Sequence, residues 1–422
     1  MYGCLAGVIP INDVSSNQVI SRLESMPRVI EKHRWIAHMD LDAFFASCEQ
    51  QEHTEYRGRP VVVGALPGNR GVVAASSYEA REFGIRSAMP ISEAYRRCPD
   101  AVYLRPDIEK YRKISKHVFQ ILGTITPAVE AASIDEAYLD IGGLDKLMGP
   151  PETIGHEIKQ RIYSGTGLTA SVGIGPNRLI AKLGSDYHKP DGLTVVTPDR
   201  VLDFLAPMPV SNLRGVGHQT QKILDRLGIR IVAQLRTCPL EKLEQHLGNK
   251  AAASFHNQAF GIASNQVVPG QGRKSISKET TFGADVRDHA LLHDVLRGLA
   301  AEVARTARRE GLSGSVVTLK IRFEGFETYT RQHKQAAPSN DEREILKTAW
   351  QLFNKGDLPE NPVRLIGVGI SGWEDDQPAQ ADLFDEPEQK AFNQQVLKTI
   401  DAVTEKFGKG LLQVGVSRKT DK

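Results

Sequence analysis

The stretch Ala132-Ser133-Ile134-Asp135-Glu136-Ala137-Tyr138-Leu139-Asp140 places two adjacent carboxylates, Asp135 and Glu136, inside a run of apolar and β-prone residues. The run predicts a strand or a tight hairpin. Charged pairs at such a place are costly unless something neutralises them. For an isolated Asp-Glu pair, the usual interpretation is a sheet edge or turn with both acids in water. The alternative is one half of a divalent-metal site, and the rest of the chain decides between the two.

A second acidic segment lies upstream. Residues 35–42 predict a buried strand that ends in acids, and residues 43–50 predict the helix that follows it. A strand that delivers Asp40 at its carboxyl end, before an immediate turn, presents a carboxylate and nearby backbone groups to a ligand. Strands alternate with helices to about residue 200. We therefore expect an α+β body around both acidic segments.

The composition is that of an ordinary globular protein with several domains. The chain has 422 residues, of which 40% are hydrophobic and 25% charged, and a formal net charge of +2. Its length predicts two to four domains. No apolar run approaches the roughly 20 residues that span a bilayer, and the N-terminus lacks the basic segment of an export signal. The cysteines lie far apart without a Cys-x-x-Cys pair, which suggests neither a zinc ribbon nor a disulfide framework and fits a reducing cytoplasm: Cys4, Cys48, Cys98 and Cys238.

Candidate phosphate ligands follow the first acidic strand. Residues 76–84 predict a helix on which Tyr78 and Arg81, three residues apart, share a face. A Tyr hydroxyl and an Arg fork on one face can bind a phosphate chain, although many surface helices carry the same pair. Lys189, in the turn at 188–192, is either another phosphate contact or a solvated turn lysine.

A glycine-rich turn opens the next segment. Leu213-Arg214-Gly215-Val216-Gly217 precedes a helical run from Gln219 to Leu227, within an all-helical segment of about residues 205–262. The pattern is typical of a helix-hairpin-helix, in which glycines let backbone N–H groups approach a phosphate at a helix N-terminus.

The last folded unit combines long helices with an alternating strand. Residues 317–323 alternate strictly, so that Thr318, Lys320 and Arg322 occupy one face. A polar face is common to half-buried sheets. Two cations among its three residues, flanked by Arg331 and Lys334 on the next strand, favour a nucleic-acid backbone as the ligand.

The chain continues with an acidic segment at 374–388, which we expect to be disordered. Within it, Gln380-Ala381-Asp382-Leu383-Phe384 has the form of a recognition peptide, because nothing nearby can bury Leu383 and Phe384. Residues 393–407 predict a last amphipathic helix.

The motifs together resemble the Y family of translesion DNA polymerases, most closely its DinB or DNA polymerase IV branch. They are MDLDAFFASCEQ from residue 39, AASSYEAREFGIRSAMP from 74, SIDEAYLD from 133, SVGIGPNRLIAKLGSDYHKPDG from 171 and LRGVG from 213. The resemblance extends from about residue 35 to 375. A narrower alternative within the family, the UmuC branch, is faintly similar around residues 45–49.

The resemblance implies a right-hand architecture with an α+β fold. The expected parts are an N-terminal extension (1–33), palm (34–43 and 111–200), small fingers (44–110), helix-hairpin-helix thumb (201–264), linker (265–273), α+β little finger (274–373), acidic linker with a clamp-binding peptide (374–389), and an amphipathic helix and tail (390–422).

It also implies the site. Asp40, Asp135 and Glu136 would hold two Mg²⁺ ions, with the carbonyl of Leu41 as a further ligand. The chemistry agrees, because Mg²⁺ takes oxygen ligands and shares them with phosphates. The triphosphate and sugar of the incoming nucleotide would meet a set that includes a steric gate at Phe45: Phe44, Phe45, Tyr78, Arg81 and Lys189.

The partners follow in the same way. Primer-template DNA would contact Gly215 and Gly217 in the thumb and the cations of the little finger, and a sliding clamp would bind Gln380, Leu383 and Phe384. We expect a cytoplasmic monomer that extends primers past damaged bases with low fidelity and without an exonuclease. The alternative of another class is a catalytically silent DNA-binding adaptor. It would lose metal carboxylates, and all three are present here.

Overall fold

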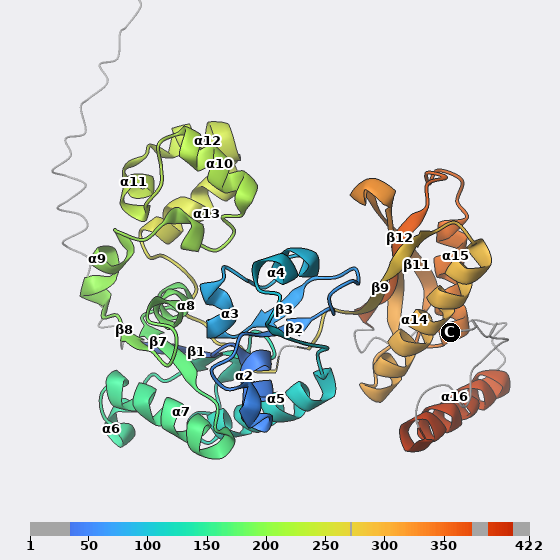
Figure 1. Ribbon diagram of the computed structural model, residues 1–422, viewed down its shortest axis with the longest axis horizontal. Coiled ribbons are helices and arrows are strands. Elements are labelled where there is room, and N and C mark those ends of the chain that lie inside the picture. The colour runs from blue at the N-terminus through green and yellow to red at the C-terminus, as the bar shows by residue number, and fades with distance from the viewer. Residues whose placement is uncertain (1–33, 271, 374–386, 408–422) are drawn as a thin grey trace, which may run out of the picture. The chain divides into compact units, whose positions relative to one another are not determined.

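A computed structural model describes residues 34–270, 272–373 and 387–407 (Figure 1). The chain divides into two compact units, Met1–Phe44 with Ile108–Gly270, and Phe45–Asp107 with Gln271–Lys422. The peptide Gln380–Phe384 and residues 1–33 lie outside the described residues. None of the described helices is long and apolar enough to cross a membrane.

The first unit is built on a five-stranded sheet in the order β5-β6-β1-β7-β8. The central strand β1 is antiparallel to both β6 and β7, and β8 runs parallel to β7. Helices α5, α6, α7 and α8 belong to the same unit, and α8 packs against β1 and β7. The bounds are β1 Ile36–Leu41, β5 Val129–Ala131, β6 Glu136–Asp140, β7 Ala170–Gly175, β8 Leu193–Val195, α5 Ile108–Gly123, α6 Asp145–Met148, α7 Pro151–Thr166 and α8 Arg178–Tyr187.

Helix α8 lies unusually close to the sheet because Gly173 has no side chain. A Cβ at Gly173 would lie 2.1 Å from the carbonyl oxygen of Ala181 and 2.2 Å from the amide nitrogen of Ser185. The helix begins where the side chain of Asn177 accepts a hydrogen bond from the amide of Ile180, a standard N-cap. This close packing sets the residues of α8 directly over β1.

The rest of the first unit is helical. Its core is formed by apolar residues such as Leu205, Leu224, Leu235 and Phe255. The helices are α9 Val201–Leu205, α10 His218–Arg226, α11 Val232–Thr237, α12 Leu240–Leu247 and α13 Asn249–Ala259, with short 3₁₀ turns at Pro198–Arg200 and Val210–Asn212.

The second unit contains two sheets. The smaller has the order β3-β2-β4, with β4 parallel to β2, a strand that the sequence did not reveal. The elements around it are α2 Phe44–Glu52, whose first residue belongs to the first unit, a 3₁₀ turn at Thr54–Tyr56, β2 Val61–Gly64, β3 Val73–Ser76, α3 Tyr78–Glu82, α4 Ile91–Arg97 and β4 Val102–Leu104.

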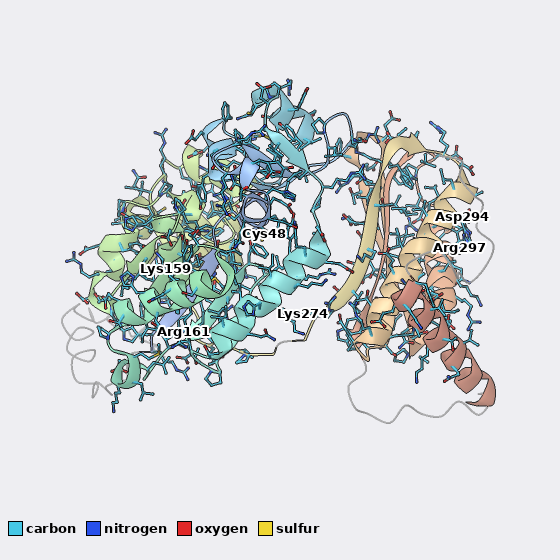
Figure 2. All side chains as sticks on the ribbon, turned by 60° about the horizontal axis from the view of Figure 1, so that its bottom comes forward. Cys48, Lys159, Arg161, Lys274, Asp294 and Arg297 are labelled. Atoms are coloured by element: carbon cyan, nitrogen blue, oxygen red, sulfur yellow. The ribbon has the colours of Figure 1, made fainter. Side chains whose placement is uncertain are left out.

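The larger sheet is antiparallel, in the order β11-β10-β12-β9, and packs one face on α14 and α15. Asp288 and Asp341 cap the two helices. Figure 2 shows Asp294 and Arg297 on α14, where they form an ion pair of 3.3 Å, and Lys159 and Arg161 on α7 of the first unit. The bounds are β9 Ser275–Val286, α14 His289–Arg309, β10 Gly314–Phe323, a 3₁₀ turn Glu324–Phe326, β11 Thr328–Ser339, α15 Glu342–Phe353, β12 Val363–Trp373 and α16 Pro387–Phe407.

Helix α16 begins earlier than the sequence predicted, at Pro387 instead of Asn393. A proline fits the first turn of a helix, where no amide donor is needed, so Pro387 starts the helix and does not interrupt it. Asp401 joins α16 to α14, since it accepts hydrogen bonds from Arg308 at 2.6 and 2.8 Å.

Candidate active site

The three predicted carboxylates meet at one end of the five-stranded sheet. Asp40 on β1 stands directly opposite Glu136, the first residue of β6. Asp135 lies in the turn just before β6, and its carbonyl oxygen accepts a hydrogen bond of 3.0 Å from the amide of Leu41. The hairpin interpretation of the acidic stretch is therefore correct, with Asp135 in the turn and Glu136 on the strand.

Asp40 is the most enclosed of the three acids. Its side chain is 8% exposed and that of Glu136 is 29% exposed, whereas Asp135 is half-buried and pairs with the hydroxyl of Ser133. Asp40 is therefore buried within the acidic cluster of Asp40, Asp135 and Glu136, and the other two acids are partly exposed to solvent.

Two lysines form ion pairs with this acidic cluster. Lys182 on α8 places its Nζ 3.0 Å from Asp40 Oδ2 and 3.0 Å from Glu136 Oε1. Lys189, a predicted phosphate ligand, places its Nζ 2.7 Å from the same oxygen of Asp40. Both amines also contact Asp186, at 3.4 Å from Lys182 and 2.9 Å from Lys189. The sequence analysis missed Lys182, although it stands in the motif that begins at Ser171, because no local pattern relates it to acids 142 and 46 residues away.

The charges shift the pKa values of these groups. Burial raises the pKa of the Asp40 carboxyl to about 6, against the opposing pull of Lys189 and Lys182. The neighbouring His38 ring lowers the pKa of Glu136, with Lys182 acting in the same direction. Burial alone would lower the pKa of Lys182, but the attraction of Asp40, Asp186 and Glu136 outweighs it and raises that pKa. Burial opposes the charge of Lys189 as well, but the attraction of Asp40 and Asp186 raises the pKa of that lysine.

A buried histidine, His38, lies next to Glu136. His38 on β1 is fully buried, with Nδ1 2.8 Å from the hydroxyl of Ser185 and Nε2 3.4 Å from Glu136 Oε2. The Ser185 hydroxyl also donates to the carbonyl of Lys182 at 2.8 Å. Burial lowers the pKa of the His38 imidazole. The sequence showed only a histidine within an apolar strand and gave no reason to assign it to the site.

Asp42 fixes the loop that carries Lys189. Its carboxylate accepts hydrogen bonds of 2.8 Å from the Ser171 hydroxyl on β7 and from the amide of Asp191. The loop after α8 is thereby held at the end of the sheet, next to the acids.

The other predicted nucleotide ligands lie mostly in the second unit. Tyr78 and Arg81 share a face of α3 as predicted, with the guanidinium carbon of Arg81 4.4 Å from the centre of the Tyr78 ring. Arg81 Nε also donates to the carbonyl of Ser76 at 3.2 Å. At the start of α2, Phe44 is buried and its ring lies 6.1 Å from that of Tyr111, whereas Phe45 is half-buried.

The glycine turn of the helical region has the expected form. Gly215 adopts a φ of +93°, which favours glycine, and Gly217 is the residue before α10. The buried side chain of Gln258 holds the turn, since it accepts from the amide of Arg214 at 3.0 Å and donates to its carbonyl at 3.1 Å. The hydrogen bonds from Gln258 therefore hold the backbone of the turn just before α10 in a fixed conformation.

The larger sheet exposes the face that carries Lys320 and Arg322. This face forms a groove of about 450 Å³ whose floor includes Gly367 and Gly369 of β12. Lys320 forms an ion pair of 2.6 Å with Glu279, and Arg322 donates to the hydroxyl of Thr328 at 2.8 Å.

Arg331 does not share that face. It pairs in register with Leu319, which is buried against the helices, and its guanidinium contacts Asp357. Residues opposite each other in an antiparallel pair point to the same side of the sheet, so Arg331 lies on the side opposite Lys320 and Arg322. The structure therefore separates Arg331 from the two cations that the sequence analysis expected it to flank. The pattern of β11 does not fix the register, because polar residues lie on both sides of the strand.

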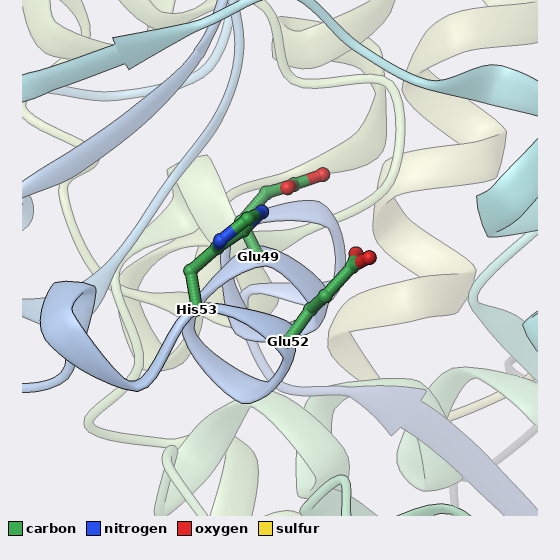
Figure 3. Close-up of side chains that lie close together, drawn as sticks. All are labelled: Glu49, Glu52 and His53. Carbon is green, nitrogen blue, oxygen red and sulfur yellow. The ribbon is translucent and has the colours of Figure 1, made fainter.

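Another group of ligand-type side chains lies on and after α2 (Figure 3). Atoms of Glu49, Glu52 and His53 lie within 4.8 Å of one another. His53 already packs its ring on Tyr56 at 5.0 Å and places Nδ1 3.5 Å from Glu55. We assign no metal to this group, because acidic clusters of this kind are common without one.

The residues at the end of β1 fit a divalent metal. Oxygens of Asp40 and Glu136 converge on one positive charge, the ammonium of Lys182, with a further carboxylate in the adjacent turn. Hard cations such as Mg²⁺ and Mn²⁺ take such an oxygen set. Carboxylates from two adjacent strands, with lysines beside them, suit an enzyme of phosphate transfer, in which metal ions share their oxygen ligands with phosphates.

Comparison with known families gives the same result. Residues 39–186 match the impB/mucB/samB family, residues 273–383 its C-terminal domain, and residues 211–262 the thumb domain of DNA polymerase-iota. The chain belongs to this family, the Y family of DNA polymerases.

Curated relatives and solved structures agree. DNA polymerase IV of Halorhodospira halophila is 44% identical over 83% of this chain and 98% of its own length, and DNA polymerase IV of Xanthomonas campestris pv. campestris is 42% identical over 85% and 100%. The Y-family polymerase chimera Dbh-Dpo4(243-245)-Dbh superposes with a TM-score of 0.72 at 28% identity, over 80% of this chain and 99% of that one. DinB from Sulfolobus solfataricus has a TM-score of 0.57 at 27% identity, over 80% and 98%. The predicted family and multidomain α+β fold are confirmed.

Proposed function

We propose that this chain extends a DNA primer by two-metal-ion catalysis at the site formed by Asp40, Asp135 and Glu136. As a Y-family DNA polymerase, it is a template-directed enzyme of the translesion type that uses primer-template DNA, deoxynucleoside triphosphates and a divalent metal. The observation that supports this site best is the convergence of Asp40 and Glu136 on a single cation at 3.0 Å.

The acids and one backbone carbonyl are the proposed metal ligands. Asp40, Asp135 and Glu136 would hold two Mg²⁺ ions together with the carbonyl oxygen of Leu41. When bound, these ions would lower the pKa of the primer 3′-hydroxyl and neutralise charge on the triphosphate. His38 lies next to this set, with Nε2 3.4 Å from Glu136 Oε2.

The nucleotide would be held by groups that the sequence singled out. We assign Lys189 to the triphosphate, because its amine already lies beside Asp40, and Tyr78 and Arg81 to the same role. Phe45 is the proposed steric gate, since an aromatic ring beneath the sugar leaves no room for a 2′-hydroxyl. We assign Phe44, which lies 6.1 Å from the ring of Tyr111, to the nucleotide site as well.

Two surfaces would hold DNA. The backbone around Gly215 and Gly217 would bind a primer-template phosphate. The open face of the larger sheet, which carries Lys320 and Arg322, would bind the duplex backbone. Arg331 is left out of this surface because it lies on the other side of its sheet.

The domain boundaries given by the resemblance are part of the proposal. We assign the five-stranded sheet to the palm, α9 to α13 to the thumb, the sheet of β2 to β4 to the fingers and the sheet of β9 to β12 to the little finger. We further propose that Gln380, Leu383 and Phe384 bind a sliding clamp and that the enzyme is a cytoplasmic monomer.

Primer extension tests this function. The full-length protein should extend a primer on undamaged and lesion-bearing templates when Mg²⁺ is added, and should stop when the metal is chelated. Deoxynucleotides should be used in preference to ribonucleotides. DNA binding without any extension would instead support the catalytically silent adaptor, which the three intact carboxylates disfavour.

A further inference from the structure

Lys182 occupies the point on which two of the proposed metal ligands converge. Its ammonium lies 3.0 Å from an oxygen of Asp40 and 3.0 Å from an oxygen of Glu136. Bound Mg²⁺ requires its oxygen ligands at about 2.0–2.1 Å. An ammonium and a metal ion cannot both lie between the same two oxygens, so one must displace the other.

The position of Lys182 is built into the fold. Its helix approaches the sheet through Gly173, and its carbonyl accepts a hydrogen bond from Ser185, whose oxygen in turn faces His38. The Lys182 side chain is 30% exposed, so solvent reaches part of it.

A second carboxylate lies within reach of the same amine. Asp186, one helical turn further along α8, has its Oδ2 3.4 Å from Lys182 Nζ, and its side chain is 46% exposed. A rotation of the Lys182 side chain toward Asp186 would keep the ammonium paired while it leaves Asp40 and Glu136. Lys189 differs, because it forms ion pairs with Asp40 and Asp186 and does not bridge the two proposed ligands.

We propose that Lys182 is the built-in counter-cation of the metal site. It neutralises Asp40 and Glu136 while no metal is bound, and moves to Asp186 when a divalent ion enters. Metal affinity is then set by this competition. The inference rests on the proposed function, because it takes Asp40 and Glu136 as metal ligands.

Mn²⁺ binding to the full-length protein, measured by titration calorimetry without DNA or nucleotide, tests the competition. Lys182→Gln should bind Mn²⁺ at least about tenfold more tightly, which corresponds to about 1.4 kcal/mol. Lys182→Arg, which keeps the charge, should not gain affinity. Lys116→Gln, at an exposed lysine of α5, should match the wild type. An unchanged affinity of Lys182→Gln would overturn the inference.

Thermal unfolding supplies a readout that does not depend on catalysis. In the presence of chelator, Lys182→Gln should melt below the wild type, because two ionised acids lose their partner. Added Mn²⁺ should raise its melting temperature more than that of the wild type. An equal rise in both proteins would contradict the competition even if the variant were partly destabilised.

Asp186→Asn tests where the lysine goes. The substitution should weaken Mn²⁺ binding in the wild type, because Lys182 loses its second partner, and should weaken it much less in the Lys182→Gln background. Equal effects in both backgrounds would show that Lys182 does not depend on Asp186. Asp40→Asn separates the inference from its premise: if Mn²⁺ binds the wild type and this variant alike, the proposed metal site itself is wrong.

Discussion

The register of the larger sheet makes a quantitative prediction about DNA binding. Lys320 and Arg322 lie on its open face and Arg331 on the opposite side. Each phosphate that a cation neutralises adds about −0.9 to the slope of log affinity against log salt concentration. Removing Lys320 and Arg322 together should therefore make that slope shallower by about 1.8.

The same arithmetic gives a change in affinity. A fourfold rise in salt, from about 50 to about 200 mM, weakens binding by about 12-fold through two such contacts, and this part of the salt dependence should disappear in the double variant. Lys320 first has to leave Glu279, to which it is bound at 2.6 Å. An exposed ion pair of this kind stabilises by about 0.2–1 kcal/mol, so Glu279→Gln should tighten binding by about 1.4- to fivefold.

Fluorescence anisotropy with a labelled primer-template, repeated over a series of salt concentrations, measures both slope and affinity. Lys320→Gln with Arg322→Gln is the test variant, and Arg331→Gln is the matched control on the same sheet. Circular dichroism confirms that each variant is folded. A slope that falls as much in Arg331→Gln as in the double variant would refute the assignment of the open face as the DNA-binding surface.

The remaining predictions concern the sugar, the clamp and acid stability. Phe45→Val should raise ribonucleotide incorporation markedly in single-turnover assays, and unchanged sugar selectivity would make Phe45 only a packing residue. Alanine at Leu383 and Phe384 should weaken clamp pull-down without changing the activity of the isolated enzyme, and equal pull-down would place the clamp site elsewhere. The hydrogen bond from Arg178 lowers the pKa of Glu130 from its usual 4.5, so Glu130 contributes stability above about pH 4.5 that is lost as pH falls through its folded pKa. In Glu130→Gln, the midpoint of urea unfolding should depend less on pH over that acid range than it does in the wild type. A pH dependence identical to that of the wild type would contradict the role of the ion pair.

The sequence predicted the parts of the site that are carried by strand ends. Asp40 and Glu136 were recognisable because each interrupts an apolar, β-prone run, and antiparallel pairing then brings them opposite each other. Lys182 and His38 were not recognisable. Lys182 belongs to the polar side of an amphipathic helix, and the close approach of α8 at Gly173 joins it to the acids. His38 belongs to a buried strand and reaches Glu136 through the pairing of β1 with β6.

The little finger shows the other limit of sequence reasoning. The alternation of residues 317–323 predicted which side of β10 is buried, and the structure agrees. The neighbouring strand β11 carries polar residues on both sides, so its register, and with it the side on which Arg331 lies, depends on pairing that no local pattern encodes. The start of α16 at Pro387 was missed for a similar reason, because proline opens helices as well as ending them.

The proposed metal ligands are tested most directly by one pair of measurements on Asp135→Asn. Asp135 is half-buried in the turn before β6 and, among the described residues, its side chain bonds only within that turn, to Ser133, so its substitution should leave the fold and the affinity for primer-template DNA nearly unchanged. Primer extension in saturating Mg²⁺ should fall by at least about 100-fold, since a ligand that positions the metal supplies several kcal/mol to the transition state. Extension at the wild-type rate, with DNA binding intact, would contradict the two-metal site on which the account rests.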